Sequence, residues 1–186
     1  GTLVPLRVPT FTMQNTDKRF AWATNYIETL ASCENWQAST SATIGFEYRK
    51  LLDAAAMKTV GNTEFVMFQG HDFSMRGMSS LASAISSGMG HLVAGFVGTD
   101  TVPAIQAAEY LYRANIETEL VGTSIPASEH SIQCAYGDDM EYFRRLINEV
   151  HPNGFVSIVS DGYDFWDVIG RVIPALKNDI LARKGG

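Results

Sequence analysis

Short apolar runs alternate with longer stretches of helical pattern along the last two thirds of the chain. Four runs are rich in β-branched and aromatic side chains, at residues 65–69, 92–97, 116–121 and 155–159. Runs of this length and content predict strands, and the amphipathic stretches between them predict helices. The pattern therefore predicts an α/β fold in which four βα units occupy residues 65–186.

Polar, reactive residues follow each predicted strand at once. They form clusters at residues 71–77, 98–101, 124–131 and 160–164. In parallel α/β folds the active site lies at the carboxyl ends of the strands. Four such clusters at one predicted edge indicate an enzyme.

Residues 1–60 predict lead-in strands and helices before the βα units. Residues 1–14 alternate apolar and polar positions with two interrupting prolines, as in edge strands or an extended segment. N-cap chemistry at residues 15–17 and an apolar stripe after it predict a first helix. A second helical candidate covers residues 39–57.

Small residues and prolines shape the later predicted helices. Residues 78–88 are rich in Ser, Ala and Gly, which lets another backbone approach closely at some cost in helix propensity. Pro103 stands near the first turn of the next helix, where its missing N–H costs little. Pro174 divides the last two candidates. Because no linker, short repeat or low-complexity segment occurs, we expect the whole chain, residues 1–186, to form one unit.

Four βα units are half of an eight-unit barrel, which needs roughly 250 residues. A half barrel would leave an open strand edge and an uncovered apolar face, which soluble proteins avoid. Because a half barrel would be unfavourable by itself, we expect the chain to be a central fragment of a longer protein, with its four βα units forming an incomplete (β/α) barrel. A complete small open α/β sheet is the alternative.

Composition narrows the class of protein. The chain is 46% apolar and 18% charged, which is enough for one sizeable core. Its net charge is −6 and its 14 Lys and Arg are scattered, so we expect no nucleic-acid partner. No apolar run has the length of a membrane span, and Cys33 and Cys134 form no metal or disulfide framework. We expect a cytoplasmic protein with reduced thiols and no membrane partner.

His130 is the first candidate catalytic residue. It lies between Glu129 and Ser131, beyond a proline-containing loop at a predicted strand end. Histidine can act as a nucleophile or base near neutral pH. A histidine that only packs or hydrogen-bonds at a helix start is the structural alternative, and local sequence leaves both open.

Asp100 also has two interpretations. It lies where a helix is predicted to begin, so it is a candidate N-cap. Alternatively, Thr101 caps the helix and Asp100 accepts hydrogen bonds from a substrate amide. Phe73 and Arg76 share an earlier loop and suit a ligand with a flat ring and a phosphate. A buried Phe beside a surface Arg is the bland alternative.

The last cluster contains Ser160, Asp161 and Asp164. The two carboxylates could bind Mg²⁺, orient a histidine or cap the helix that follows. His91, at the start of a predicted strand, and His151, before a proline, are interpreted as structural. The chain has no Walker-type loop, GxGxxG fingerprint or GxSxG elbow, so the commonest modes of nucleotide binding are unsupported.

Taken together, the clusters resemble a known family. HDFSMRG, GTDTV, SIPASEHS and VSDGYDFW occur in the order and spacing of the nicotinamide phosphoribosyltransferases, and QNTDKRFAWATNYIETL resembles the segment before them. The resemblance implies a partial barrel of the type II phosphoribosyltransferase kind. It also implies a reaction of NAD salvage, in which nicotinamide and 5-phosphoribosyl-1-pyrophosphate give nicotinamide mononucleotide and pyrophosphate. The related nicotinate phosphoribosyltransferases share the fold but differ around His130.

The resemblance implies roles for the residues around His130. His130 matches the family histidine that ATP phosphorylates, and Asp164 matches the acidic residue that interacts with it. Glu129 lies beside them, with a part in metal or phosphate handling. Mg²⁺ is the implied cofactor, where it neutralises the pyrophosphate, and ATP is the implied coupling substrate. No residue is assigned as a metal ligand.

The resemblance implies a substrate pocket as well. Phe73 matches the aromatic residue that stacks on nicotinamide, Asp100 the carboxylate that accepts from the carboxamide, and Arg76 a phosphate-contacting arginine. The same carboxylate would repel nicotinate. The remaining expected substrate-binding residues line the pyridine pocket and its tunnel: Ser160, His71, Ser124, Ile125 and Ala127. A homodimer in which two subunits share each site is also implied.

Two departures limit the transfer. Met75 stands where family members often carry Tyr. The chain also stops before the family's Arg-Pro-Asp-Ser-Gly segment and glycine-rich phosphate loops, and lacks the aromatic residue that the family supplies across its dimer interface. We therefore expect little turnover from this chain alone. The alternatives are a nicotinate phosphoribosyltransferase and a catalytically silent fragment or interaction module.

Overall fold

The computed structural model describes residues 1–185. The chain forms two compact units, Gly1–Ser124 and Ile125–Gly186, which are described separately. Both are rich in helix, and the first contains a small parallel sheet. The predicted mixture of helices and parallel strands is confirmed in this coarse sense. The expected single unit and the expected barrel stay predictions.

The first unit is built on one long helix, α1 (Ala21–Thr59). A 3-10 turn, η1 (Lys18–Phe20), precedes it, and the carboxylate of Asp17 caps that turn by accepting from the Arg19 N–H. The two helices predicted here are therefore one helix. Residues 31–38 contain neither Gly nor Pro, so no residue between the two candidates interrupts the hydrogen-bond ladder.

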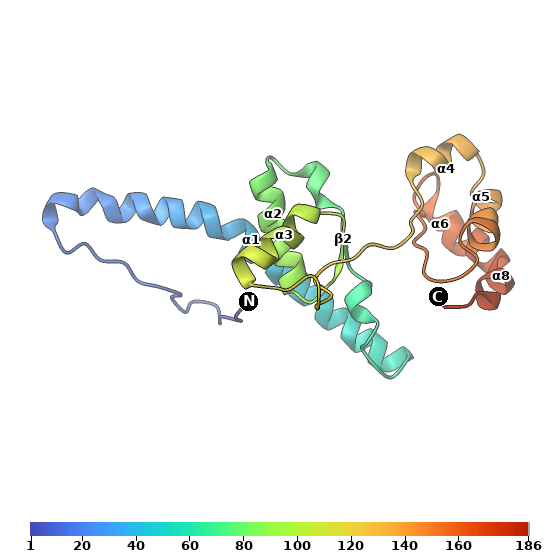
Figure 1. Ribbon diagram of the computed structural model, residues 1–186, viewed down its shortest axis with the longest axis horizontal. Coiled ribbons are helices and arrows are strands. Elements are labelled where there is room, and N and C mark those ends of the chain that lie inside the picture. Colours follow the sequence, from blue (N-terminus) through green and yellow to red (C-terminus); the bar gives the residue numbers. More distant parts are fainter. Residues whose placement is uncertain (186) are drawn as a thin grey trace. The chain divides into compact units, whose positions relative to one another are not determined.

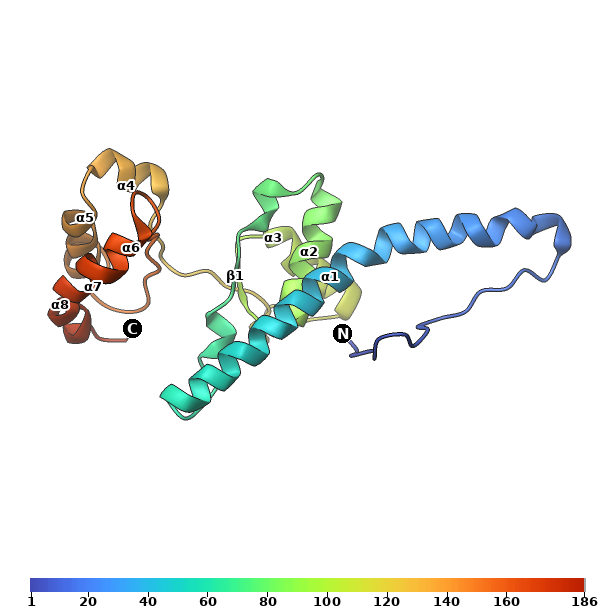
Figure 2. The same cartoon turned by 180° about the vertical axis from the view of Figure 1, so that it is seen from behind.

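Two shorter helices pack beside α1. Helix α2 (Leu81–Val93) begins with a capping box between Ser80 and Ser83. It packs across α1, and α3 (Val102–Tyr112) packs on α2 (Figures 1 and 2). A Cβ on Gly90 would lie 2.8 Å from the Ala38 carbonyl oxygen of α1. The predicted close approach of a second backbone to this small-residue helix is confirmed.

The sheet has two short parallel strands, β1 (His71–Asp72) and β2 (Gly98–Thr99). Their register pairs His71 with Gly98 and Asp72 with Thr99. A further parallel bridge joins Gly98 to Thr123, so three segments lie side by side. This arrangement is the frame for the first group of candidate site residues.

The four predicted strands are wrong in their bounds. The run at 65–69 contains the 3-10 helix η2 (Val66–Phe68), and the run at 92–97 begins inside α2. Residues 116–118 form a turn, in which the Asn115 side chain accepts from the Glu117 N–H and competes with strand pairing. In the run at 155–159 only Ser157 forms a parallel bridge, to Ala127. Short apolar runs do not distinguish strands from buried helical turns.

The second unit is a small group of helices. Helix α4 (His130–Tyr136) is followed by α5 (Asp139–Arg145), which continues as a π-helical turn, η4 (Leu146–Val150). After a loop come α6 (Phe165–Asp167), the π-helical turn η5 (Val168–Val172), α7 (Ile173–Ala175) and α8 (Lys177–Ala182). The predicted break at Pro174 falls at Leu176 instead. Pro174 lies in the first turn of α7, where its missing N–H costs little.

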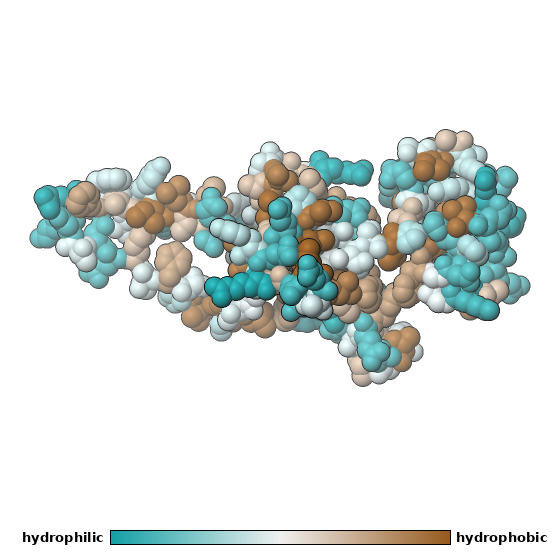
Figure 3. Space-filling view, viewed as in Figure 1, coloured by the Kyte–Doolittle hydropathy of each residue, from teal (hydrophilic) through white to brown (hydrophobic). Residues whose placement is uncertain are grey.

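Each unit has its own small core. In the first unit, Met89 of α2 packs with Ala104 and Ala108 of α3. In the second, the core consists of Tyr142, Phe143, Ile147, Val168, Val172 and Leu176. By contrast, α1 buries none of its residues, and Figure 3 shows apolar surface along it. Within the described part of the chain, no helix is both long enough and apolar enough to cross a membrane.

Candidate active site

The first group of candidate residues lies at the carboxyl ends of the paired segments of the first unit. The Asp100 N–H donates to the Asp72 carbonyl (3.0 Å), and the Thr99 N–H donates to the Thr123 carbonyl (2.9 Å). These bonds hold the ends of β1, β2 and the segment before Ser124 at one edge. The clusters at residues 71–77 and 98–101 therefore lie at one edge, whereas the gathering of all four predicted clusters at that edge stays a prediction.

Asp100 does not cap α3. The N-cap position belongs to Thr101, and the Asp100 side chain instead contacts residues of the neighbouring segments. Its Oδ1 lies 2.8 Å from His71 Nε2 and accepts a hydrogen bond from the Ser124 hydroxyl at 3.2 Å. The side chain is 49% exposed. Thr101 holds the N-cap position without a side-chain cap, and binding of a ligand by the Asp100 carboxylate stays a prediction.

Phe73 and Arg76 follow β1: Phe73 lies just before the 3-10 helix η3 (Ser74–Gly77), and Arg76 lies within it. The Phe73 ring is 54% exposed and stacks on the His71 ring, with centroids 4.3 Å apart and planes 25° apart. The alternative interpretation, in which Phe73 is a buried core residue, is therefore wrong. Arg76 is exposed and has no ion-pair partner among residues 1–185, which leaves its guanidinium available to an anion.

The carboxylate of Asp72, at the end of β1, is buried next to this edge, and the sequence did not single it out as a site residue. Asp72 Oδ1 accepts from the Ser74 N–H at 2.9 Å. Burial raises the pKa of Asp72, but the Ser74 hydroxyl and N–H, the Thr101 hydroxyl and the charge of His91 together outweigh it, so the pKa lies below its ordinary value. Of these donors the Ser74 N–H makes a hydrogen bond, whereas Asp72 Oδ2 and the two hydroxyls are buried without a partner. An Asp beside a predicted strand end, flanked by His71 and Phe73, was the available signal.

His91 was expected at the start of a strand, but it lies in the last turn of α2. Its Nε2 contacts the Gly98 carbonyl at 2.8 Å, and its ring stacks on Phe96. Burial lowers its pKa, and the Gly98 carbonyl and the Asp72 charge oppose that shift without cancelling it. These contacts with β2 agree with the structural role expected for His91.

The second group of candidate residues lies in the second unit. The Ser157 N–H donates to the Pro126 carbonyl, and the Ser128 N–H to the Ser157 carbonyl, both at 2.9 Å. This pairing brings the start of α4 beside the loop after Val159. His130, the first residue of α4, has its Nε2 3.0 Å from Asp161 Oδ1, and both side chains are more than half exposed.

The resemblance implied that Asp164 interacts with His130, but the hydrogen-bond partner of His130 in the structure is Asp161. Its Oδ1 caps α6 by accepting from the N–H groups of Trp166 (2.9 Å) and Asp167 (3.1 Å). Two backbone donors hold this carboxylate at a helix start, whereas Asp161 is free to approach the histidine. Asp161 therefore contacts the histidine, and Asp164 caps α6.

The other predicted residues of this unit lie around the same pairing. Glu129 is the N-cap residue of α4 but makes no side-chain cap. Ser160 donates to the Ile158 carbonyl at 3.1 Å. Ile125 is half-buried and Ala127 is exposed. The candidate residues are therefore divided between the two units, and their assembly into one site stays a prediction.

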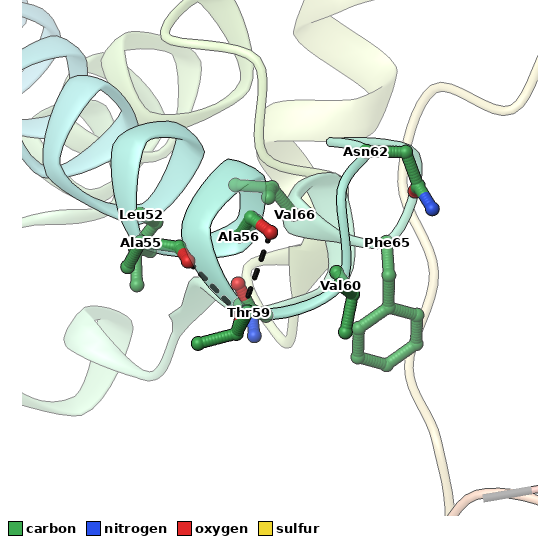
Figure 4. A pocket seen from close by; sticks show the side chains of 9 residues that line it. Leu52, Ala55, Ala56, Thr59, Val60, Asn62, Phe65 and Val66 are labelled. Carbon is green, nitrogen blue, oxygen red and sulfur yellow. Dashed lines mark hydrogen bonds between the residues drawn. The ribbon is translucent and has the colours of Figure 1, made fainter.

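A hollow in the first unit lies away from these residues. It has a volume of about 400 Å³, and its walls come from the end of α1 and the residues leading into η2 (Figure 4). Its hydroxyl, on Thr59, donates to the Ala55 and Ala56 carbonyls within the helix. The walls carry no titratable side chain: Leu52, Ala55, Ala56, Thr59, Val60, Asn62, Phe65, Val66 and Gln69. The hollow therefore offers no catalytic chemistry.

Metal chemistry has no ready-made centre in the described residues. Within 1–185, no three His, Cys, Asp or Glu side chains come together in a way that could hold an ion. These residues do not fit a protein-built Mg²⁺ site.

The chain matches known phosphoribosyltransferases that act on nicotinate or nicotinamide, as their names state. Residues 68–186 match the nicotinate phosphoribosyltransferase (NAPRTase) family. The chain is 51% identical over 185 residues to the nicotinamide phosphoribosyltransferase of Acinetobacter baylyi, covering 98% of this chain and 36% of that protein. It is 38% identical to the nicotinamide phosphoribosyltransferase of Mycoplasma genitalium, with 97% and 38% covered, and 39% identical to that of Mycoplasma pneumoniae, with 96% and 37% covered. The chain thus spans little more than a third of these relatives' length. It belongs to the nicotinate phosphoribosyltransferase (NAPRTase) family.

Proposed function

We propose that the chain carries the pyridine-binding part of a nicotinamide phosphoribosyltransferase, an enzyme of NAD biosynthesis. The observation that carries the proposal is the Asp100 carboxylate, which does not cap α3 and lies half exposed at the same edge as the exposed Phe73 ring. A flat ring and an acceptor suit a pyridine that bears a carboxamide. The relatives' names point to the same substrate.

In the proposed reaction the pyridine nitrogen bonds to the anomeric carbon of phosphoribosyl pyrophosphate. The bond from that carbon to the pyrophosphate oxygen breaks, and its electron pair leaves with pyrophosphate. Phe73 holds the ring by stacking, and Asp100 accepts from the carboxamide NH₂ and so fixes its orientation. Arg76, exposed and without an ion-pair partner within residues 1–185, contacts phosphate.

Asp100 also sets the preference between the two pyridines. Nicotinate would place its carboxylate against that of Asp100, and like charges repel at this distance. Nicotinamide offers a donor instead, so the hydrogen bond to Asp100 is made only with the amide. Nicotinate transfer is the second candidate, because the matched family bears its name.

The second unit supports the proposed coupling to ATP. The His130 ring is held by the contact of its Nε2 with Asp161, and the side chain is more than half exposed, so the other ring nitrogen, Nδ1, is the atom proposed to receive a phosphoryl group. Mg²⁺ on the pyrophosphate, a homodimer, a cytoplasmic location and a (β/α) barrel in the whole protein belong to the same proposal. They are supported by the resemblance of the sequence to the family.

The test is the pyridine preference of Asp100→Asn, measured as kcat/KM for nicotinamide and for nicotinate in the full-length protein. Removal of the charge should lower the ratio in favour of nicotinamide by about tenfold or more. Asp53→Asn, which removes a carboxylate paired with Arg49 on α1, is the matched control and should leave the ratio unchanged. A wild-type protein that prefers nicotinate would refute the proposed substrate and support the second candidate.

A silent interaction module would behave differently. A working pocket raises the melting temperature when nicotinamide is added, because the ligand binds only the folded state. A module without a pocket would show no shift with either pyridine.

A further inference from the structure

The two oxygens of Asp100 are not equivalent. Oδ1 is engaged by His71 Nε2 at 2.8 Å and by the Ser124 hydroxyl at 3.2 Å. No hydrogen bond from residues 1–185 reaches Oδ2. Because two groups hold one oxygen in place, the other keeps a fixed position and a free acceptor site.

His71 is itself held on several sides. Its side chain is only 19% exposed. A Cβ on Gly98, its partner in the register of β1 and β2, would lie 2.8 Å from Nδ1, so the ring rests directly against β2. The other face stacks on Phe73. Since Asp100 Oδ1 can only accept, we assign the proton to Nε2.

We propose that His71 is the residue that positions Asp100 for the carboxamide, rather than only a wall of the pocket. The His71 N–H and the Ser124 hydroxyl occupy Oδ1, and Oδ2 remains to accept the substrate NH₂. The same imidazole supports the Phe73 ring, so one side chain sets the distance between the stacking surface and the acceptor. This inference rests on the proposed function and adds a specificity-determining contact to it.

Two substitutions separate the donor from the ring. His71→Phe keeps an aromatic ring beside Phe73 but removes the N–H, whereas His71→Gln offers an amide N–H near the position of Nε2. We expect His71→Phe to weaken nicotinamide binding by about tenfold, as for loss of a hydrogen bond to a charged group. His71→Gln should restore most of the affinity. The first unit of chain 1–186 contains all four residues of the inference: His71, Phe73, Asp100 and Ser124. Dissociation constants for nicotinamide are measured on this chain by NMR titration.

A positioning residue must act through its partner. In an Asp100→Ala background, His71→Phe should therefore have no further effect on nicotinamide affinity. His91→Phe is the matched control, since His91 also donates to an oxygen of the first unit and also stacks on a Phe. It should lower the melting temperature and leave the dissociation constant unchanged.

The outcomes distinguish the inference from the proposed function. If wild-type chain binds nicotinamide but His71→Phe behaves like His91→Phe, the inference is wrong and the proposed function stands. If wild-type chain binds neither pyridine, the proposed function fails in this chain. The contact is tested without ligand as well: imidazole ¹⁵N spectra should show the His71 proton on Nε2, and Asp100→Ala should shift that signal. An unshifted signal would overturn the inference by itself.

Discussion

At the scale of single residues, the buried Asp72 and the half-buried His91 are titratable groups of β1 and α2, next to the candidate pyridine site. The pKa of Asp72 lies below its ordinary value because its contacts with Ser74 and Thr101 and the charge of His91 together outweigh the cost of burial. His91 is neutral at physiological pH because burial lowers its pKa below the ordinary 6.5. Asp72 lies in β1 and His91 contacts the Gly98 carbonyl of β2, so their protonation affects the stability of the first unit.

The pH dependence of stability follows from the two shifts. The unfolded chain protonates its histidine near 6.5, whereas folded His91 does so only at lower pH. Stability is therefore full above 6.5 and falls as the pH drops through the folded value. Asp72, whose pKa is lowered from 3.8, adds a second loss in more acidic solution.

We expect the free energy of unfolding to decrease between about pH 7 and about pH 5, and His91→Gln to remove most of that slope. Urea unfolding of wild type and variant across this range measures it. An equal slope in both proteins would contradict the assignment of the effect to His91.

At the scale of elements, helix signals were more informative than strand signals. Asp17 and Ser80 cap helices by contacts with residues near them in sequence, so a single chain segment contains the whole signal. Strands need a distant partner. The runs at 65–69 and 92–97 are apolar, but only two residues after each of them pair. The pairing partner decides the strand bounds, and a local pattern does not contain it.

The candidate site shows the same limit. The sequence placed His71, Phe73 and Asp100 at one edge, which the structure confirms, because polar residues after parallel strands gather there. It did not distinguish Asp161 from Asp164, which share a loop. The choice depends on which carboxylate meets the free N–H groups of α6, and that is a matter of backbone geometry.

The crossing of α1 and α2 depends on a missing side chain. A Cβ at Gly90 would meet the Ala38 carbonyl and the Ala42 nitrogen, each at 2.8 Å. We expect Gly90→Ala to destabilise the chain by about 1–3 kcal/mol, since neither helix backbone can yield cheaply. Denaturant unfolding gives the value.

Gly77→Ala is the control for this substitution. Nothing lies within 4 Å of the Cβ it would add, and its φ is not positive, so its effect should be near zero or slightly stabilising. If both variants lost the same stability, the close crossing of α1 and α2 would not be the cause of the loss.

At the scale of the whole molecule, this chain corresponds to little more than a third of its relatives. It contains Phe73 and Asp100, which we propose to bind the pyridine, and His130, which we propose to receive a phosphoryl group.

We expect chain 1–186 alone to bind nicotinamide but to turn over poorly or not at all, and the full-length protein to be active. Product formation from phosphoribosyl pyrophosphate, measured for both at equal concentration, tests this. Clear steady-state turnover by the isolated chain would contradict the expectation.

The exposed aromatic residues have a spectroscopic consequence. Trp22 and Trp36 on α1 and Trp166 on α6 are 66%, 58% and 77% exposed, and they are the three tryptophans of the chain. The intrinsic fluorescence of the folded chain therefore resembles that of hydrated indole, and unfolding of either core changes it little. A shift of the emission to shorter wavelength would instead report that another surface has covered one of these helices.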